Sequence, residues 1–517
     1  MEKFRDLLKN FFLFIFNIFL MFIIFGGFFY KAEFCMVKYG DVPMLIRQHP
    51  LFLISGISIG LLIYFLLWMI IEKHSSSLIF RKGWLLYSTV IFFQILVVYF
   101  FRIKLTADWE VIYRIVQKII AGDFSEFNRG GYLYAYPHNL GVTLYYTLIN
   151  ILVSTNLYFP RVLNIFYSLI TFFLINKLFV LINSANIRHK NQFLIYTLLF
   201  IPPVFMINLV YNEVLSTMLF LLGIYFCVKF NKQKSLKLLV FAVFLFSFGN
   251  FIRSIGFIFI ISAFFYLLLA KINWKTLALF IVLGIIGLTA PLHLINWYLY
   301  SSGKISERLG ENSVPVLKWI HIGLNRKYFG YWDQGESYWM YATDASWNKQ
   351  RANNLYYESI KRKIKEYGFL ELANIYFKKL VWLWTEGTYQ SVYLGMSHSS
   401  PGGYTKETAL SRFFDQKIEN REPIKMVMYF ENFVSLLLIF LFVNYIILGR
   451  KWNLIKEEML LILILLMFIL FYLFWEVKPR YIYPAYPYIL MLSFISFSHL
   501  VKLLISRGID IKYMGKG

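Results

Sequence analysis

The sequence predicts an all-α polytopic membrane protein, with about 12–13 transmembrane helices, an interfacial helix in an outer loop and a larger extracytoplasmic segment. Of its 517 residues, 59% are hydrophobic and only 15% are charged, against roughly 25% charged residues in an ordinary soluble domain. Apolar runs of about 20 residues recur along the chain, which is the length that a bilayer core requires. A soluble fold must present a polar exterior, whereas a bilayer acts as an apolar solvent.

The formal net charge of +24 comes from 52 Lys and Arg against 28 Asp and Glu. These basic residues lie mainly in short loops between apolar runs, as the positive-inside rule expects. The pattern therefore excludes a nucleic-acid partner and favours contact with membrane lipids or with a phosphate group. The composition, rich in Lys, Ile and Phe, is typical of an AT-rich bacterial genome.

The apolar runs define an N-terminal transmembrane module over 1–299 and C-terminal helices over 429–517, with the extracytoplasmic segment 300–428 between them. We expect spans at 11–30, 50–72, 84–103, 139–155, 160–182, 192–209, 212–230, 236–249, 251–270, 275–299, 429–449, 457–475 and 482–505. An uncleaved first helix is expected, because no small-residue cleavage site follows it.

Basic loops set the predicted orientation, with both termini in the cytoplasm. The residues that mark the inner side are Lys3, Arg5, Lys9, Lys73, Arg81, Lys82, Arg188, His189, Lys190, Lys232, Lys234, Lys237, Lys271, Lys275, Arg450, Lys451, Lys456 and the tail from Lys502. The loop 104–138 and the segment 300–428 then lie outside. Parity requires an odd number of crossings between 138 and 185, so segment 139–155 is predicted to be re-entrant or half-buried.

The first outer loop carries the first candidate catalytic residues, Asp108 and Glu110. Ile112, Ile115, Val116, Ile119 and Ile120 follow at helical spacing, which predicts an amphipathic helix lying in the outer interface. Asp108 at its start is a candidate general base, because it is negative, fixed and close to an apolar wall. The alternative is an N-cap, a common role for Asp at a helix start.

The same loop returns to the membrane through Tyr136-Pro137-His138. Tyr136 is a candidate to stack on a sugar ring, or else an interfacial belt residue. His138 is a candidate hydrogen-bond partner of a phosphate or an acceptor, with a purely structural role as the alternative.

Two further outer positions carry basic residues. Arg253 lies in the break between runs 236–249 and 251–270, and Lys478 and Arg480 precede Tyr481 in the last outer loop. A guanidinium is permanently charged and binds two oxygens, which suits a phosphate clamp. The alternative is snorkelling to outer head groups.

The extracytoplasmic segment is rich in aromatic residues, including Trp319, Trp332, Trp382 and Trp384, with Glu386 beside them. This composition suits carbohydrate recognition and equally suits a lid packed on the membrane surface. The two cysteines, Cys35 and Cys227, have no disulfide or metal-site spacing.

These residues come from distant parts of the chain but are all expected at one membrane boundary. In layout and short motifs the chain resembles the GT-C superfamily of membrane glycosyltransferases, in particular the protein mannosyltransferase and aminoarabinose lipid A transferase group. The resemblance rests on Asp108 after a span, on Tyr136-Pro137-His138, on Arg253, and on Glu476, Arg480, Tyr481, Pro484 and Pro487. It departs from the family in having two spans before the catalytic-type loop and Trp109 between Asp108 and Glu110.

The resemblance implies a GT-C-like bundle in the cell envelope that moves a sugar from a polyprenyl-phosphate donor to an acceptor hydroxyl with inversion. The acceptor is a glycan, a lipid or a protein. Asp108 and Glu110 would be catalytic, and Tyr136, His138, Arg253, Lys478, Arg480 and Tyr481 would bind substrate. No residue set demands a metal or another cofactor. A flippase or transporter for lipid-linked glycans and a polysaccharide polymerase or ligase are the alternatives.

Overall fold

The computed structural model describes residues 2–37, 40–74, 83–153, 155–183, 187–332, 336–396, 403–455 and 457–506. Several basic residues that set the predicted orientation lie outside these ranges, namely Arg81, Lys82, Lys456 and the tail beyond Ser506. The side chains of Cys35, Arg188 and His189 are not described either.

Seven helices in the described ranges are long and apolar enough to cross a membrane. They are α1 (Glu2–Phe29), α2 (Pro50–His74), α8 (Tyr158–Asn183), α11 (Glu213–Gln233), α14 (Trp274–Ser301), α19 (Glu422–Leu448) and α21 (Tyr486–Ser506). Four shorter apolar helices accompany them: α4 (Trp84–Phe100), α12 (Leu236–Ile252), α13 (Gly256–Leu269) and α20 (Met459–Phe474). The chain is thus an all-α polytopic membrane protein, as the apolar runs predicted.

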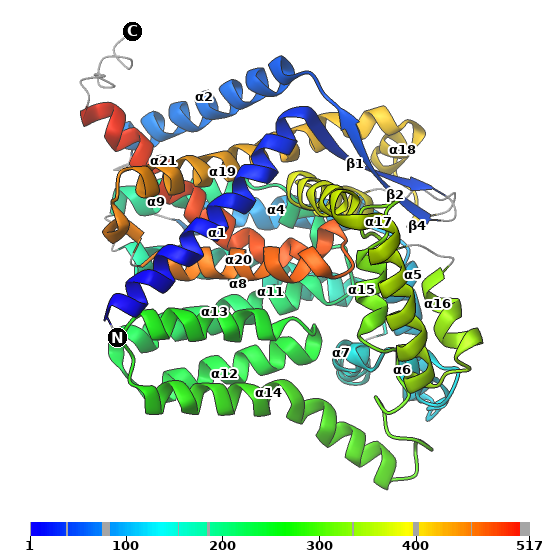
Figure 1. Ribbon diagram of the computed structural model, residues 1–517. Helices are drawn as coiled ribbons and strands as arrows, with labels where there is room; N and C mark the ends of the chain where they lie inside the picture. The colour runs from blue at the N-terminus through cyan, green and yellow to red at the C-terminus, as the bar shows by residue number, and fades with distance from the viewer. Residues whose placement is uncertain are drawn as a thin grey trace.

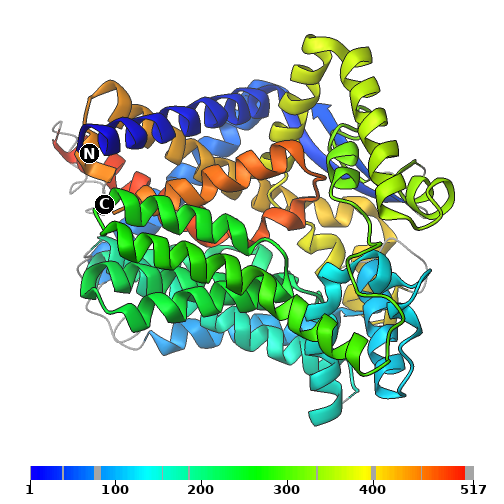
Figure 2. The same cartoon turned by 60° about the horizontal axis from the view of Figure 1, so that its bottom comes forward.

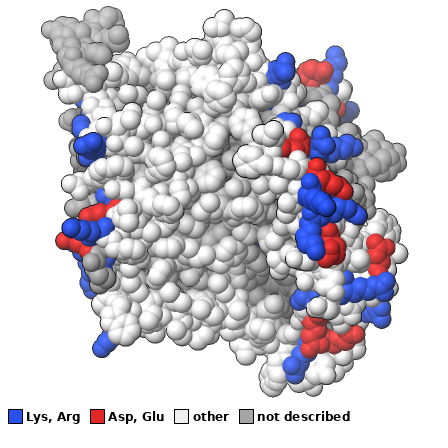
Figure 3. Space-filling model, viewed as in Figure 1, with Lys and Arg blue, Asp and Glu red and all other residues white. Residues whose placement is uncertain are grey.

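The apolar helices lie side by side and run across the view in Figure 1, with the start of α1 and the end of α21 at the same end of the bundle. Charged side chains gather at the two ends, and a broad band without them separates the two groups (Figure 3). Large apolar side chains on the bundle helices, such as Phe14 and Phe25 on α1 and Phe92 on α4, are more than half exposed. Lipid covers such side chains without the cost of exposing them to water.

Two of the predicted spans differ from the others. Segment 139–155 forms α7 (Leu140–Leu152), whose 13 residues extend about 20 Å and fall short of a core of about 30 Å. The re-entrance of this segment stays a prediction, because α13, with 14 residues, is almost as short. Segment 192–209 is broken into α9 (Ile187–Leu199) and α10 (Pro202–Met206), because Pro202 and Pro203 cannot continue a helix from residue 199.

The polar end of the bundle contains the predicted helix α5 (Ala107–Ile120), the 37-residue helix α17 (Lys349–Thr385), which is kinked at Gly368, and shorter elements that the sequence analysis did not predict. An antiparallel hairpin joins β1 (Tyr30–Val37) to β2 (Gly40–Arg47), with Tyr30 opposite Arg47. The other short elements are β3 (Arg102–Ile103), η1 (Ser125–Phe127), α6 (Tyr132–Ala135), η2 (Pro137–Asn139), α15 (Leu317–Gly323), α16 (Glu336–Trp339), η3 (Met340–Asp344), η4 (Val392–Met396), β4 (Tyr404–Lys406), α18 (Ala409–Gln416), η5 (Ile418–Arg421) and η7 (Pro479–Ala485). At the opposite end, η6 (Trp452–Ile455) lies between α19 and α20.

The loop 104–138 and the segment 300–428 form one structure at this end of the bundle (Figure 2). Strand β3 pairs with β4, and the amide of Val314 donates to the carbonyl of Ala135. Helix α5 is amphipathic as predicted and buries Ile112, Ile115 and Val116. The described residues of 300–428 are therefore joined to the N-terminal module by backbone hydrogen bonds.

Candidate functional site

Asp108 is the second residue of helix α5 and not its N-cap, so the capping alternative is wrong. The N-cap is Thr106, whose extended backbone (φ −146°, ψ 163°) begins the helix. Between them, Ala107 has a φ of 52°, a left-handed conformation that costs a residue with a Cβ about 1–2 kcal/mol. Strained backbone of this kind is concentrated at functional sites.

The Asp108 carboxylate has two partners from other parts of the chain. Its Oδ2 lies 3.5 Å from Nη2 of Arg480, and its Oδ1 accepts a hydrogen bond of 3.3 Å from the hydroxyl of Tyr132. The side chain remains 41% exposed. The carboxylate is thus oriented on two sides and open to a ligand on a third.

A chain of hydrogen bonds fixes Tyr132 in turn. The amide Nδ2 of Asn139 donates to the Tyr132 hydroxyl at 3.0 Å, and Tyr211 donates to Oδ1 of the same Asn139 at 3.1 Å. Burial raises the pKa of Tyr132 and of Tyr211 well above the ordinary value. Both phenols therefore keep their protons, and Tyr132 can serve only as a donor to Asp108.

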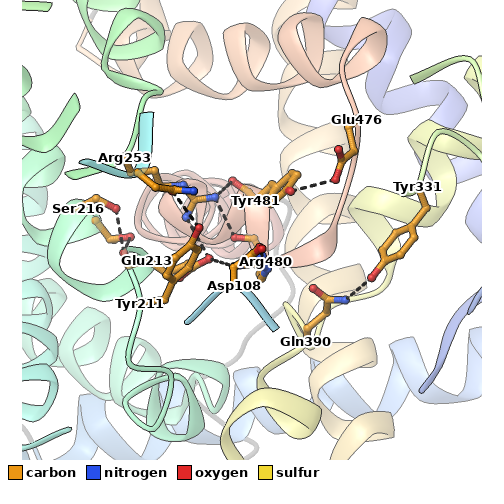
Figure 4. Close-up of polar contacts among 12 residues, drawn as sticks. Asp108, Tyr211, Glu213, Ser216, Arg253, Tyr331, Gln390, Glu476, Arg480 and Tyr481 are labelled. Atoms are coloured by element: carbon orange, nitrogen blue, oxygen red, sulfur yellow. Dashed lines mark hydrogen bonds and ion pairs between the residues drawn. The ribbon is translucent and has the colours of Figure 1, made fainter. Parts of the chain in front are cut away.

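The two arginines meet around a buried carboxylate that the sequence analysis missed, Glu213 at the start of α11 (Figure 4). Glu213 Oε1 lies 2.7 Å from Nη1 of Arg480 and 3.8 Å from Nη1 of Arg253. All three side chains are at most 7% exposed. A buried carboxylate of this kind partly neutralises the guanidinium pair, which is the usual condition for buried charge.

Arg253 is held by the backbone of η7. Its Nη2 donates to the carbonyls of Arg480 at 3.4 Å and Tyr481 at 3.1 Å. Its Nη1 and the Oε2 of Glu213 are buried and have no hydrogen-bond partner among the described residues. The cluster therefore retains one unused donor and one unused acceptor.

Aromatic rings surround the Arg480 guanidinium. Its central carbon lies 5.6 Å from the ring centre of Trp109, 5.2 Å from that of Tyr211 and 5.5 Å from that of Tyr481. Rings at these distances attract a cation and exclude water from it. Trp109, which separates the two acids in the sequence, thus has a role of its own in positioning Arg480.

Tyr481 connects this cluster to a second buried acid. Its hydroxyl donates to Oε1 of Glu476 at 3.1 Å, while Oε2 of Glu476 has no hydrogen-bond partner among the described residues. Burial raises the pKa of the Glu476 carboxyl, and the charges of Lys478 and Lys318 oppose this shift. The ammonium of Lys478 lies over Tyr331 and Trp332, 5.6 and 5.5 Å from the ring centres.

Lys318 on α15 is a second residue that the sequence analysis missed. It is 2% exposed, and its ammonium donates to the Tyr136 hydroxyl at 2.8 Å. The ammonium also lies over the rings of Tyr136 and Trp319, at 4.8 and 4.9 Å. Burial lowers the pKa of Lys318 to about 8, against the opposing charges of Glu476 and Asp108.

His138 adjoins Lys318 through the same two rings, each 5.9 Å from the imidazole. The imidazole is exposed on one side but crowded by protein on the others, and this desolvation lowers the pKa of His138 to about 4. At neutral pH it is therefore uncharged, with one donor and one acceptor nitrogen.

The structure brings together most of the predicted site residues but leaves Glu110 apart. Asp108, Arg253, Arg480 and Tyr481 form one cluster, which we call the carboxylate–arginine cluster and define with Glu213. Tyr136 and His138 adjoin it through Lys318. Glu110 is exposed and forms no ion pair or side-chain hydrogen bond with any other described residue. It lies two residues after Asp108 on α5, so its side chain is rotated by about 200° around the helix axis from that of Asp108.

The charges of the carboxylate–arginine cluster and of its neighbours Lys318, Lys478 and Glu476 suit an anionic ligand. Four cations, Arg253, Arg480, Lys318 and Lys478, face three carboxylates, which are those of Asp108, Glu213 and Glu476. One positive charge is left over, and a second appears when Glu476 is protonated. The described residues contain no group of three or more His, Cys, Asp or Glu side chains placed to hold a metal ion.

Comparison of the chain with protein-family models, with curated proteins and with solved structures finds no match.

Proposed function

We propose that the protein is a membrane glycosyltransferase of GT-C-like architecture that uses a polyprenyl-phosphate sugar and inverts the anomeric centre. The observation that carries this proposal is the pairing of Asp108, an accessible carboxylate, with the buried guanidinium of Arg480 at 3.5 Å. A proton acceptor and a permanent cation are thereby adjacent at the polar end of an apolar bundle. Transfer from a lipid phosphate to a hydroxyl requires both groups.

In the proposed step, Asp108 accepts the proton of the acceptor hydroxyl. The acceptor oxygen forms a bond to the anomeric carbon while the bond from that carbon to the phosphate oxygen breaks. The phosphate leaves with the electron pair, and nearby cations stabilise its charge. Nη1 of Arg253, which has no hydrogen-bond partner among the described residues, and the ammonium of Lys318 are the groups we assign to this charge, together with Arg480.

The proposal places the cluster on the outer face and both termini in the cytoplasm. Support comes from the opposite end of the bundle, where three helices are followed by basic residues with left-handed backbone: Lys234 (φ 57°), Lys271 (φ 60°) and Arg450 (φ 51°). Basic residues at this position complement the negative ends of the helix dipoles. They also obey the positive-inside rule if this end is cytoplasmic.

The test is transfer of a radiolabelled sugar from a polyprenyl-phosphate donor by the purified protein in nanodiscs. We expect Asp108→Asn to lower turnover by at least about 100-fold, the usual contribution of a general base. Glu366→Gln is the matched control, because Glu366 is an exposed carboxylate on α17 that forms a 3.9 Å ion pair with Arg362; it should retain full turnover.

Three outcomes would count against the proposal. Near-normal turnover of Asp108→Asn would remove this residue from catalysis. If the protein reconstituted in liposomes moves the lipid-linked sugar across the bilayer without transferring it to an acceptor, a flippase is favoured instead. A product in which both donor and acceptor are lipid-linked glycans would identify a polymerase or ligase.

A further inference from the structure

The opposite end of the bundle contains a hollow of about 690 Å³, a volume in the range of small-molecule sites. We refer to it as the basic hollow. It is lined by Asp6, Lys9, Asn10, Tyr445, Arg450, Lys451, Trp452, Asn453 and His499. These residues come from the first turns of α1, the end of α19 with the loop and η6 that follow it, and α21.

The lining carries three cations, Lys9, Arg450 and Lys451, against the single carboxylate of Asp6. Two of the cations are tethered within the lining: Lys9 donates to the carbonyl of Trp452, and Lys451 donates to the hydroxyl of Tyr445. Both tethers use neutral acceptors, and the charge of Lys9 also acts on the buried carboxyl of Glu458. Three cations against the carboxyl groups of Asp6 and Glu458 leave an excess of one positive charge.

Arg450 differs from the other two cations, because its guanidinium makes no ion pair or hydrogen bond with another described residue. It is exposed, and its backbone is left-handed with φ 51°. Glycine or asparagine is usual at this position after a helix, and arginine there is strained. An unpaired guanidinium held at a strained position is suited to an external anion with several oxygens.

Exposed apolar residues flank the lining residues along the chain. Leu448, which ends α19 two residues before Arg450, is 82% exposed, and Leu7 and Phe11, which follow Asp6 and Asn10 on α1, are 68% and 53% exposed. Trp452 lies within the lining itself, and tryptophan favours the boundary between head groups and acyl chains. A ligand that joins a phosphate to acyl chains matches both parts of this surface.

We infer that the basic hollow binds a phosphate group, carried by an anionic phospholipid of the leaflet at this end of the bundle. The phosphate lies against Arg450, Lys9 and Lys451, and the acyl chains lie against Leu448, Leu7 and Phe11. This site is separated from the carboxylate–arginine cluster by the apolar band, so the inference is independent of the proposed transferase activity.

The experiment is a titration of the full-length, delipidated protein in neutral detergent, with binding measured by native mass spectrometry. One arm uses a short-chain phosphatidylglycerol, a second uses short-chain phosphatidylcholine, and a third uses inorganic phosphate. We expect one phosphatidylglycerol to bind in preference to phosphatidylcholine. Inorganic phosphate competing for the same site would identify a soluble phosphate as an alternative source of the ligand and would still support the site.

The matched variants are Arg450→Asn and Lys234→Asn, because both residues are exposed, cationic and left-handed at the same end of the bundle. Asparagine tolerates this backbone, so both variants should fold. Since each cation near an anionic surface contributes about a fivefold effect, Arg450→Asn should weaken phosphatidylglycerol binding about fivefold and Lys234→Asn should leave it unchanged. Equal binding of the two lipids, or an equal loss in both variants, would overturn the inference.

Discussion

The carboxylate–arginine cluster and the basic hollow are two groups of cations at opposite ends of the same bundle. They differ in how far their arginines are buried and in whether a carboxylate pairs with them. In the cluster, Arg253 and Arg480 are at most 7% exposed and share the buried carboxylate of Glu213. In the hollow, Arg450 is exposed and lacks any described partner. A buried guanidinium therefore needs a carboxylate partner, because an uncompensated buried charge is costly, whereas an exposed charge is screened by water.

The first prediction, with the greatest change in the free energy of unfolding, concerns the pairing of buried charge. Glu213→Gln leaves Arg480 and Arg253 without their shared carboxylate, so we expect it to lower the free energy of unfolding by about 3–5 kcal/mol. Thermal unfolding of the purified protein in detergent measures this loss. In the hollow, Arg450→Asn should change the free energy by less than about 0.5 kcal/mol, and comparable losses in the two variants would contradict the comparison.

A second test asks whether geometry or charge matters in the cluster. Arg480→Lys keeps the positive charge but cannot contact Glu213 and Asp108 with two separate nitrogens of a planar fork. The loss of one charged hydrogen bond should cost about 1.5–3 kcal/mol, read as lower sugar-transfer turnover or lower thermal stability. If the lysine variant matches the native protein in both measurements, the cluster needs only a point charge.

A third test concerns the pH dependence of the proposed transfer. Because burial lowers the pKa of Lys318 to about 8, its amine is positive below this pH and neutral above it. Turnover that needs the ammonium should therefore fall as the pH rises through about 8, approaching tenfold per pH unit. Lys318→Arg keeps the charge at all these pH values and should remove the alkaline decline, provided that its thermal unfolding is native-like. A decline at the same pH in the variant would assign it to another group.

The last prediction, with the smallest change in stability, concerns the backbone strain beside Asp108. Ala107 beside Asp108 has left-handed backbone with φ 52°, and glycine adopts this conformation without strain. Ala107→Gly should raise the free energy of unfolding by about 0.5–1 kcal/mol, since relief of strain outweighs the extra entropy of the unfolded chain. Denaturant titration can detect this gain, and a lower stability would show that the Ala107 methyl group makes a packing contribution larger than the strain.

The chain itself determined the membrane class, the positions of the apolar helices and the amphipathic helix α5. These features depend on local composition and on the spacing of apolar residues, so they can be predicted from each segment without knowledge of its contacts with distant residues. The predicted runs 236–249 and 251–270, for example, correspond to α12 and α13, and the polar break between them contains Arg253. Sidedness along the chain also indicated that Asp108, Arg253 and Arg480 would share one boundary.

Tertiary structure alone decided which charges touch. Glu213 begins an apolar run and Lys318 lies among aromatic residues, so neither has a local pattern that marks it as part of a site. Their roles follow from packing, which places Glu213 against two arginines and Lys318 against Tyr136. The pairing of β3 with β4 escaped prediction for the same reason, since Arg102 pairs with Lys406 about 300 residues away. The hairpin of β1 and β2 is local, and the sequence analysis did not predict it. Hydropathy is a property of each segment, whereas the compensation of a buried charge is a property of a neighbourhood that exists only after folding.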